Sequence, residues 1–227
     1  MRDYVMDPPA RPSLPVIGTD ARFAVRRIYC VGRNYAEHAR EMGHDPNREP
    51  PFFFSKPGDC LLGDDAPISI PARSRDLHHE VELVVALGAG GRDLSPEAAL
   101  AAVWGQGIGI DLTLRDVQAE AKALRRPWDL SKGFDGAAVC GPLHPCQTPL
   151  QSGEIALFVN GDLRQSGDLA QMIWSIAEQI ADLSTWVELK AGDLIYTGTP
   201  AGVGKLESGD HVSARISGLG GIDLRVA

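Results

Sequence analysis

Two glutamates separated by a single residue are the clearest candidates for chemistry in this chain. Glu80 and Glu82 open a run rich in valine and leucine that ends near Leu87. Alternate side chains of a β-strand share a face, so both carboxylates are expected on the same side. Two like charges on a half-buried face are costly to desolvate, and a hard cation such as Mg²⁺, Mn²⁺ or Ca²⁺ removes that cost. The alternative is a solvent-facing edge strand with two ordinary surface glutamates.

A histidine and a second glutamate form another candidate pair. His38 and Glu41 lie in a short segment between Asn34, a suitable N-cap, and Gly43, a suitable C-terminal stop. In a helix over this segment the two side chains share a face, because they are three residues apart. Such a pair suits acid–base chemistry, and the alternative is an exposed histidine–glutamate pair on a surface helix.

Composition and charge exclude several classes of protein. The net charge of −8 and the lack of a block of Lys and Arg argue against a nucleic-acid-binding protein. No stretch approaches the ~18–20 apolar residues of a membrane span, and the proline-rich start has no apolar core of a secretory signal. The four cysteines form no CxxC pair, which predicts neither a zinc site nor a disulfide framework. Reduced thiols in a cytoplasmic protein are the simplest expectation.

Short strands with a few helices are expected to position these residues. Residues 1–22 are predicted to be a proline-rich arm without strand or helix periodicity, followed by one domain over residues 23–227. Strands are predicted at 27–31, 80–87, 108–111, 155–160 and 211–226, and helices at 95–104, 113–125 and 169–187. Lys132 is expected in a loop. The pattern predicts a strand-dominated α+β fold.

Five blocks of the sequence, in order, resemble the fumarylacetoacetate hydrolase family. They are Cys30–His38 (CVGRNYAEH), Phe54–Pro57 (FSKP), His79–Leu83 (HEVEL), Asp111–Gln118 (DLTLRDVQ) and Thr197–Gly204 (TGTPAGVG). The resemblance runs from about residue 25 to the C-terminus. Within the family, the blocks Arg48–Phe54 and Leu169–Ser175 and the proline-rich leader are most similar to short bacterial members that hydrolyse fumarylpyruvate in gentisate degradation.

The resemblance implies a fold and a metal centre. The family fold is a mixed β-roll with a short catalytic lid helix, usually found as a homodimer. Its metal ligands correspond to Glu80, Glu82 and Asp111, an oxygen set that suits Mg²⁺ or Mn²⁺, with Ca²⁺ possible in crystals. Gly32 and Gly43 would then be hinges of the lid.

The resemblance also implies the reaction, which is hydrolysis of a carbon–carbon bond in a β-diketo acid. Water would attack the carbonyl distant from the acid group, and the enolate of pyruvate would leave. His38 would be the base that activates water, and Glu41 would orient its imidazole. Lys132 would be a cationic donor to the developing oxyanion.

Further residues are implied to contact the substrate. Arg115 and Gln118 follow Asp111 one helical turn apart, and Arg115 has either a binding or a structural role. Thr199 is expected to offer its hydroxyl and backbone N–H to the substrate carboxylate. Lys56 and Arg33 are expected to bind substrate or to shape the pocket.

The sequence does not determine the acyl half of the substrate. Arg33, Arg125, Arg126 or a residue of a partner subunit could hold the distal carboxylate of a fumaryl group. Fumarylpyruvate is the expected substrate, and the alternatives are an acylpyruvase, an oxaloacetate decarboxylase or another isomerase or decarboxylase of the family. A non-catalytic binding module is the remaining class. The sequence does not distinguish Mg²⁺ from Mn²⁺.

Overall fold

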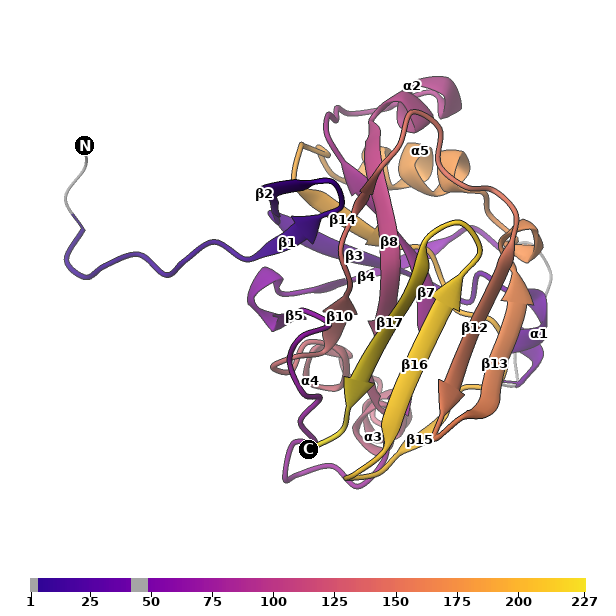
Figure 1. Cartoon of the computed structure of the whole chain (residues 1–227). Coiled ribbons are helices and arrows are strands. Elements are labelled where there is room, and N and C mark those ends of the chain that lie inside the picture. The colour runs from indigo at the N-terminus through magenta and orange to yellow at the C-terminus, as the bar shows by residue number, and fades with distance from the viewer. Residues whose placement is uncertain (1–3, 42–48) are drawn as a thin grey trace.

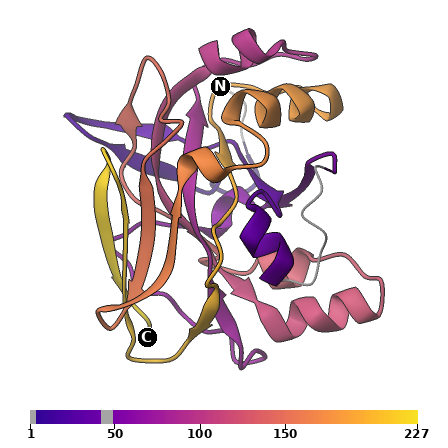
Figure 2. The same cartoon turned by 90° about the vertical axis from the view of Figure 1, so that its right-hand side faces the viewer.

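Strands dominate the computed structural model, which describes residues 4–41 and 49–227 apart from the side chain of Ala39. A mixed sheet of eight strands and an antiparallel sheet of four strands pack face to face (Figures 1 and 2). The large sheet has the order β4 (Phe52–Lys56), β3 (Arg27–Gly32), β14 (Asp193–Tyr196), β7 (Val81–Leu87), β8 (Val103–Asp111), β10 (Ala138–Cys140) and β5 (Leu61–Leu62), with β11 (His144–Pro145) paired to β8.

The other elements surround this pair of sheets. The small sheet has the order β13 (Asp162–Asp168), β12 (Glu154–Val159), β16 (His211–Ile216) and β17 (Gly220–Arg225), and a three-stranded sheet has the order β15 (Gly204–Leu206), β6 (Leu77–His79) and β9 (Thr113–Leu114). The helices are α1 (Ala36–Glu41), α2 (Pro96–Ala101), α3 (Arg115–Ala123), α4 (Asp129–Lys132) and α5 (Ile176–Trp186), with short 3₁₀ turns at η1 (Gly58–Cys60) and η2 (Leu169–Gln171). Among the described residues, no helix combines the length and apolarity needed to cross a membrane.

Strand β7 is buried along its whole length because both of its faces are covered. Val81, Leu83 and Val85 belong to the main core, which includes inward-facing residues of the small sheet. Val84 and Ala86 point the other way, into a second apolar cluster. Glu82 alternates with Val84 along the strand, so it lies on this second face, away from the small sheet. The predicted strand-dominated α+β fold with a curled mixed sheet is confirmed.

The prediction that residues 1–22 form no strand is wrong. Strands β1 (Ser13–Val16) and β2 (Thr19–Ala24) form an antiparallel hairpin, so residue 22 lies inside a strand. The hairpin is attached to the large sheet because Leu14 is buried in the second apolar cluster and the backbone N–H of Leu143 donates to Pro15 O at 2.9 Å. Prolines are tolerated here because β1 and β2 form their own two-stranded sheet.

The single helix predicted over residues 169–187 is also wrong, because the chain breaks between η2 and α5. Ser175 caps α5 through a capping box with Glu178, which starts the helix at Ile176. Before it, the backbone N–H of Trp174 donates to Asn34 Oδ1 at 2.8 Å instead of continuing a helix. The helix predicted over residues 95–104 is also shorter than expected, because it ends at Ala101 and the chain enters β8 at Val103.

Candidate active site

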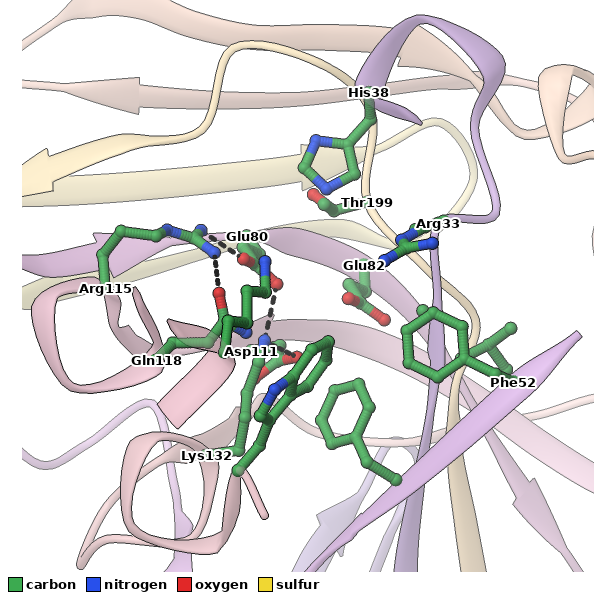
Figure 3. Close-up of a pocket in the computed structure, with 15 residues that line it drawn as sticks. Arg33, His38, Phe52, Glu80, Glu82, Asp111, Arg115, Gln118, Lys132 and Thr199 are labelled. Carbon is green, nitrogen blue, oxygen red and sulfur yellow. Dashed lines mark hydrogen bonds and ion pairs between the residues drawn. The ribbon is translucent and has the colours of Figure 1, made fainter. Parts of the chain in front are cut away.

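The three predicted metal ligands meet where β7 and β8 pair. Val81 lies opposite Ile110 in this antiparallel pair, and the N–H of Asp111 donates to Glu80 O at 2.8 Å. Glu80 lies just before β7, while Glu82 lies within it. The carboxylates of Glu80, Glu82 and Asp111 each offer an oxygen within 4.8 Å of the others, and these residues are only 5%, 2% and 1% exposed. Glu80, Glu82 and Asp111 therefore form a buried acidic triad (Figure 3).

Glu82 is the member of the triad whose charge is least compensated. Burial, followed by the charges of Asp111 and Glu80, raises its pKa well above the usual value. It accepts a hydrogen bond from the N–H of Gly198 at 2.7 Å, but within the described part of the chain no cationic side chain pairs with it. A buried carboxylate in this state is stabilised by a cation at the centre of the triad.

Glu80 is in the opposite electrostatic state. Burial opposes its ionisation, yet Lys132 and Arg115 hold the pKa of Glu80 well below its usual value. Lys132 Nζ donates to Glu80 Oε2 at 2.9 Å and to Asp111 Oδ2 at 2.7 Å. Lys132 is in the short helix α4, not in the predicted loop. Two of its three N–H groups are used, which leaves one donor for a ligand.

Lys56 contacts the triad through Asp111 and does not line the pocket. Its ammonium lies 2.8 Å from Asp111 Oδ1, although that oxygen accepts no aligned hydrogen bond. The same ammonium donates to Leu112 O at 3.1 Å and to Lys132 O. The ammonium of Lys56 is therefore held by three oxygens of the protein, which favours the second of its two expected roles, shaping the pocket, over binding substrate.

The donor set fits a divalent cation. All three groups are carboxylates, the ligands that Mg²⁺, Mn²⁺ and Ca²⁺ prefer, and buried Glu82 has no cationic partner among the described side chains. Glu80, Glu82 and Asp111 would hold the ion, and the open side of the triad faces the pocket.

His38, on α1, lies across the pocket from the triad (Figure 3), and Glu41 follows it on the same helix. His38 Nδ1 is 3.4 Å from Glu41 Oε2, so the paired carboxylate orients the imidazole and leaves Nε2 toward the pocket. Burial lowers the pKa of His38, although Glu80 and Glu41 act against this shift. Glu41 also accepts the N–H of Gly202 at 3.1 Å, which holds α1 against the turn after Thr199.

Asn34 does not cap α1, in contrast to the prediction. Its side chain donates to Trp174 O at 3.0 Å and to Thr197 O at 2.8 Å, so it ties the start of the α1 segment to two other loops. The predicted hinge and helix stop at Gly43 lies outside the described residues.

Arg115 and Gln118 lie side by side at the start of α3, as predicted. Arg115 Nη2 donates to Glu80 Oε1, and Nη1 donates to Gln118 Oε1 at 2.8 Å. Arg115 Nε also contacts His78 Nδ1 at 3.4 Å. The Gln118 carbonyl is thereby fixed, and its amide nitrogen is left as a donor at the pocket wall.

Thr199 lines the pocket, but its hydroxyl is already engaged. It donates to Val81 O at 2.8 Å and accepts from Gln165 Nε2 at 2.8 Å. The hydroxyl hydrogen is therefore not free for a substrate carboxylate, in contrast to the prediction. The backbone N–H of Thr199 stays a predicted contact.

Gln165 is a positioning residue that sequence reasoning missed. It is fully buried and reaches from β13 of the small sheet to the start of β7. Its Oε1 accepts from His79 Nδ1 at 2.8 Å and from the N–H of Val81 at 3.0 Å, and its Nε2 donates to Thr199 Oγ1 and Pro200 O. Gln165 thus fixes the backbone of Val81, the residue between Glu80 and Glu82. The only signal in the sequence is a polar residue in a strand, which does not distinguish a buried glutamine from an exposed one.

Replacing Gln165 with glutamate is expected to weaken Mn²⁺ binding about 10- to 100-fold, the range found for residues that orient metal ligands. The new carboxylate oxygen would face Pro200 O and Thr199 Oγ1, which donates its hydrogen elsewhere, so acceptors would oppose one another. Isothermal titration with Mn²⁺ measures the effect, and exposed Gln151→Glu is the matched control. Equal affinity of Gln165→Glu and the control would contradict the positioning role.

Aromatic rings and two further cations complete the pocket. Phe52, Phe54 and Trp128 line it, as do Arg33 and Lys122. Phe52 and Phe54 alternate in β4 and share a face, a signal that was present in the sequence, whereas Lys122 and Trp128 had no such signal. The free volume is about 40 Å³, room for a few water molecules.

Two of the arginines considered for the distal carboxylate are remote from this pocket. Arg125 and Arg126 do not line it, and both are exposed. Arg126 is 3.9 Å from Glu120 in an exposed ion pair. Of the arginines that the sequence offered for this task, the structure brings only Arg33 to the site.

Known proteins are similar to this chain in sequence and in structure. Residues 27–227 match the family model described as fumarylacetoacetate (FAA) hydrolase C-terminal. A fumarylpyruvate hydrolase of Ralstonia sp. is 40% identical over 80% of this chain and 95% of its own, and an oxaloacetate tautomerase of Escherichia coli (strain K12) is 41% identical over 86% and 90%.

A solved structure extends the likeness to nearly every residue. The crystal structure of fumarylpyruvate hydrolase from Pseudomonas aeruginosa, in complex with Mn²⁺ and pyruvate, matches with a TM-score of 0.96 and 45% identity, covering 99% of both chains. With the family model and these relatives in agreement, the chain belongs to the fumarylacetoacetate hydrolase family.

Proposed function

We propose that this protein is a divalent-metal-dependent hydrolase that cleaves fumarylpyruvate with water to give fumarate and pyruvate. The observation that carries the proposal is the buried acidic triad facing the His38–Glu41 pair across one pocket. The likeness to fumarylpyruvate hydrolases, one of them solved with Mn²⁺ and pyruvate, supports the choice of substrate and metal.

Five polar side chains at the pocket have tasks in this reaction. His38 Nε2 takes a proton from water as the water oxygen bonds to the carbonyl carbon of the fumaryl group, and Glu41 stabilises the imidazolium. The free N–H of Lys132 donates to the oxyanion that forms. Arg115 and Gln118 hold the pyruvyl end. The carbon–carbon bond then breaks, its electron pair forms the enolate of pyruvate, and a proton completes the product.

The metal supplies one part of the chemistry. Bound to Glu80, Glu82 and Asp111, a divalent cation is a Lewis acid for the 2-oxo acid end of the substrate. Glu80, Glu82 and Asp111 would hold this ion on the side of the pocket opposite His38, and the buried surroundings would strengthen the charge interactions in the pocket.

Oxaloacetate chemistry is the second candidate, because an oxaloacetate tautomerase is as similar to this chain as a fumarylpyruvate hydrolase. Oxaloacetate shares the 2-oxo acid end, so the triad and Arg115 would hold it in the same way. It needs no attacking water for tautomerisation. The His38–Glu41 pair, which is suited to activate water, favours hydrolysis.

A substrate panel with and without EDTA tests the proposal. Fumarylpyruvate is expected to be cleaved, with loss of its diketone absorbance, and EDTA is expected to abolish the activity until Mn²⁺ or Mg²⁺ is restored. Oxaloacetate and acetylpyruvate are assayed in parallel. Faster conversion of oxaloacetate than of fumarylpyruvate would replace the first candidate with the second, and activity that resists EDTA and metal-free buffer would contradict both.

The resemblance to the short bacterial members supports three further parts of the proposal. The protein is a homodimer, it lies in the cytoplasm, and it acts in gentisate degradation. Size-exclusion chromatography with light scattering tests the dimer directly.

A further inference from the structure

Two cations and two aromatic rings form a continuous row along one wall of the pocket. The guanidinium of Arg33 lies 5.2 Å from the centre of the Phe52 ring, Phe52 meets Trp128 edge to face at 5.7 Å, and Lys122 Nζ lies 5.1 Å from the Trp128 ring. All four residues line the pocket. We call them the cation–aromatic row.

The charges of this row are not neutralised within the protein. In residues 4–41 and 49–227, no carboxylate lies within ion-pair distance of Arg33 or Lys122. An aromatic ring holds a cation in place without cancelling its charge. The pocket therefore has four lining cations, two of them in the row, against three carboxylates that a divalent ion would compensate. The positive excess suits an anionic ligand.

The electrostatic surroundings of Lys122 agree with this excess. Its pKa is lowered, first by burial and then by the positive charges of Arg115 and Arg33. A negative group placed among these cations would relieve their mutual repulsion. Lys122 is an exposed residue of the pocket lining, so water screens its contribution more than that of half-buried Arg33.

The row lies apart from the residues that would hold the pyruvyl end. Figure 3 shows Arg33 and Phe52 on one side of the triad and Arg115 with Gln118 on the other. A chain extended from the triad along the rings would place its conjugated part against Phe52 and Trp128. Its far end would then meet Arg33, whose planar guanidinium can bind a carboxylate through two parallel hydrogen bonds.

We propose that the cation–aromatic row binds the distal carboxylate of the substrate, with Arg33 as its contact and Lys122 as a second positive charge acting from the other end of the row, and so selects 2-oxo acids that have a second carboxylate. The inference rests on the proposed function and adds the residues that choose the acyl half. It assigns a role to Lys122, and it narrows the role of Arg33 to one end of the substrate.

A pair of substrates that differ only at the distal group tests the assignment. Fumarylpyruvate is compared with crotonylpyruvate, in which a methyl group replaces the distal carboxylate. The wild-type protein is expected to prefer fumarylpyruvate by about 10- to 100-fold in kcat/KM, the size of a charged hydrogen bond lost in a pocket. Arg33→Gln is expected to remove most of this preference, mainly through a higher KM for fumarylpyruvate, and Lys122→Gln a smaller part.

Two further variants separate charge from folding. Arg33→Lys retains the charge without the bidentate geometry and is expected to restore part of the preference. Arg126→Gln removes an exposed cation outside the pocket and is the matched control, with no change in preference expected. Thermal melting with Mn²⁺ verifies that each variant is folded and binds metal.

The outcomes distinguish this inference from the proposed function. If neither acylpyruvate is cleaved, the proposed function is wrong. If both are cleaved with similar kcat/KM, or if Arg33→Gln and Arg33→Lys both retain the wild-type preference, the function stands and the assignment of the row is wrong. Loss of the preference in Arg33→Gln, with partial recovery in Arg33→Lys, supports the row.

Discussion

Replacing Glu82 with glutamine is expected to abolish Mn²⁺ binding and hydrolysis while the metal-free protein stays folded. The change removes one of three ligand charges, and we expect metal affinity to fall by more than about 100-fold, beyond the loss typical of residues that only orient ligands. Without the metal, kcat/KM is expected to fall about 10³-fold or more, because the 2-oxo acid end loses its electrophilic partner.

The stability of this variant separates a metal ligand from a structural residue. Burial and two neighbouring carboxylates already raise the pKa of Glu82, so a neutral amide of the same shape removes an unfavourable charge. In EDTA its melting temperature is expected to equal or exceed that of the wild type, while the increase caused by Mn²⁺ disappears. Exposed Glu120→Gln is the control. A Glu82→Gln protein that still melts at a higher temperature with Mn²⁺ would show that Glu82 is not a ligand.

Replacing His38 with alanine is expected to have the opposite pattern, with metal retained and hydrolysis lost. His38 is not part of the triad, so Mn²⁺ affinity and the Mn²⁺-dependent rise in melting temperature are expected to stay at wild-type values. Loss of the base is expected to lower kcat for fumarylpyruvate by about 10²- to 10⁴-fold. Normal hydrolysis by this variant would exclude His38 as the base. Conversion of oxaloacetate, which needs no activated water, is expected to fall less.

The pH dependence of the wild-type enzyme provides a second measurement of the same residue. A base must be unprotonated, and burial lowers the pKa of His38 below its usual value of 6.5. The value of kcat/KM should therefore rise with pH through an acid limb centred below 6.5 and be level near neutral pH. Glu41→Gln removes a partner that raises this pKa, so the limb should move to still lower pH. An acid limb centred above 6.5 would contradict the assignment.

The triad shows what local sequence rules can predict. The alternation of side chains in a strand placed Glu80 and Glu82 together, although Glu80 lies just outside β7. Asp111 is remote in sequence, and its place beside them depends on the register of β7 against β8, which no local rule provides. Resemblance to the family supplied that third ligand, and the structure brings it to the predicted position.

The errors come from contacts between distant segments. Apolar spacing alone favoured an unbroken helix over residues 169–187, and the break depends on a hydrogen bond from Trp174 to Asn34. Gln165 was missed for the same reason, since its partners belong to another sheet. The two roles left open for Lys56, binding substrate or shaping the pocket, could not be separated for the same reason, since Asp111 and two carbonyl groups from distant parts of the fold surround its ammonium.

Gln165 has a consequence for the order in which the molecule folds. It joins the small sheet to the start of β7, so the triad takes its final shape only after the two sheets have docked. Pairing between such distant segments is slow and comes late in folding. A divalent ion that binds the completed triad would therefore stabilise the folded state more than the transition state for folding. Mn²⁺ is then expected to slow unfolding and to leave the rate of folding nearly unchanged.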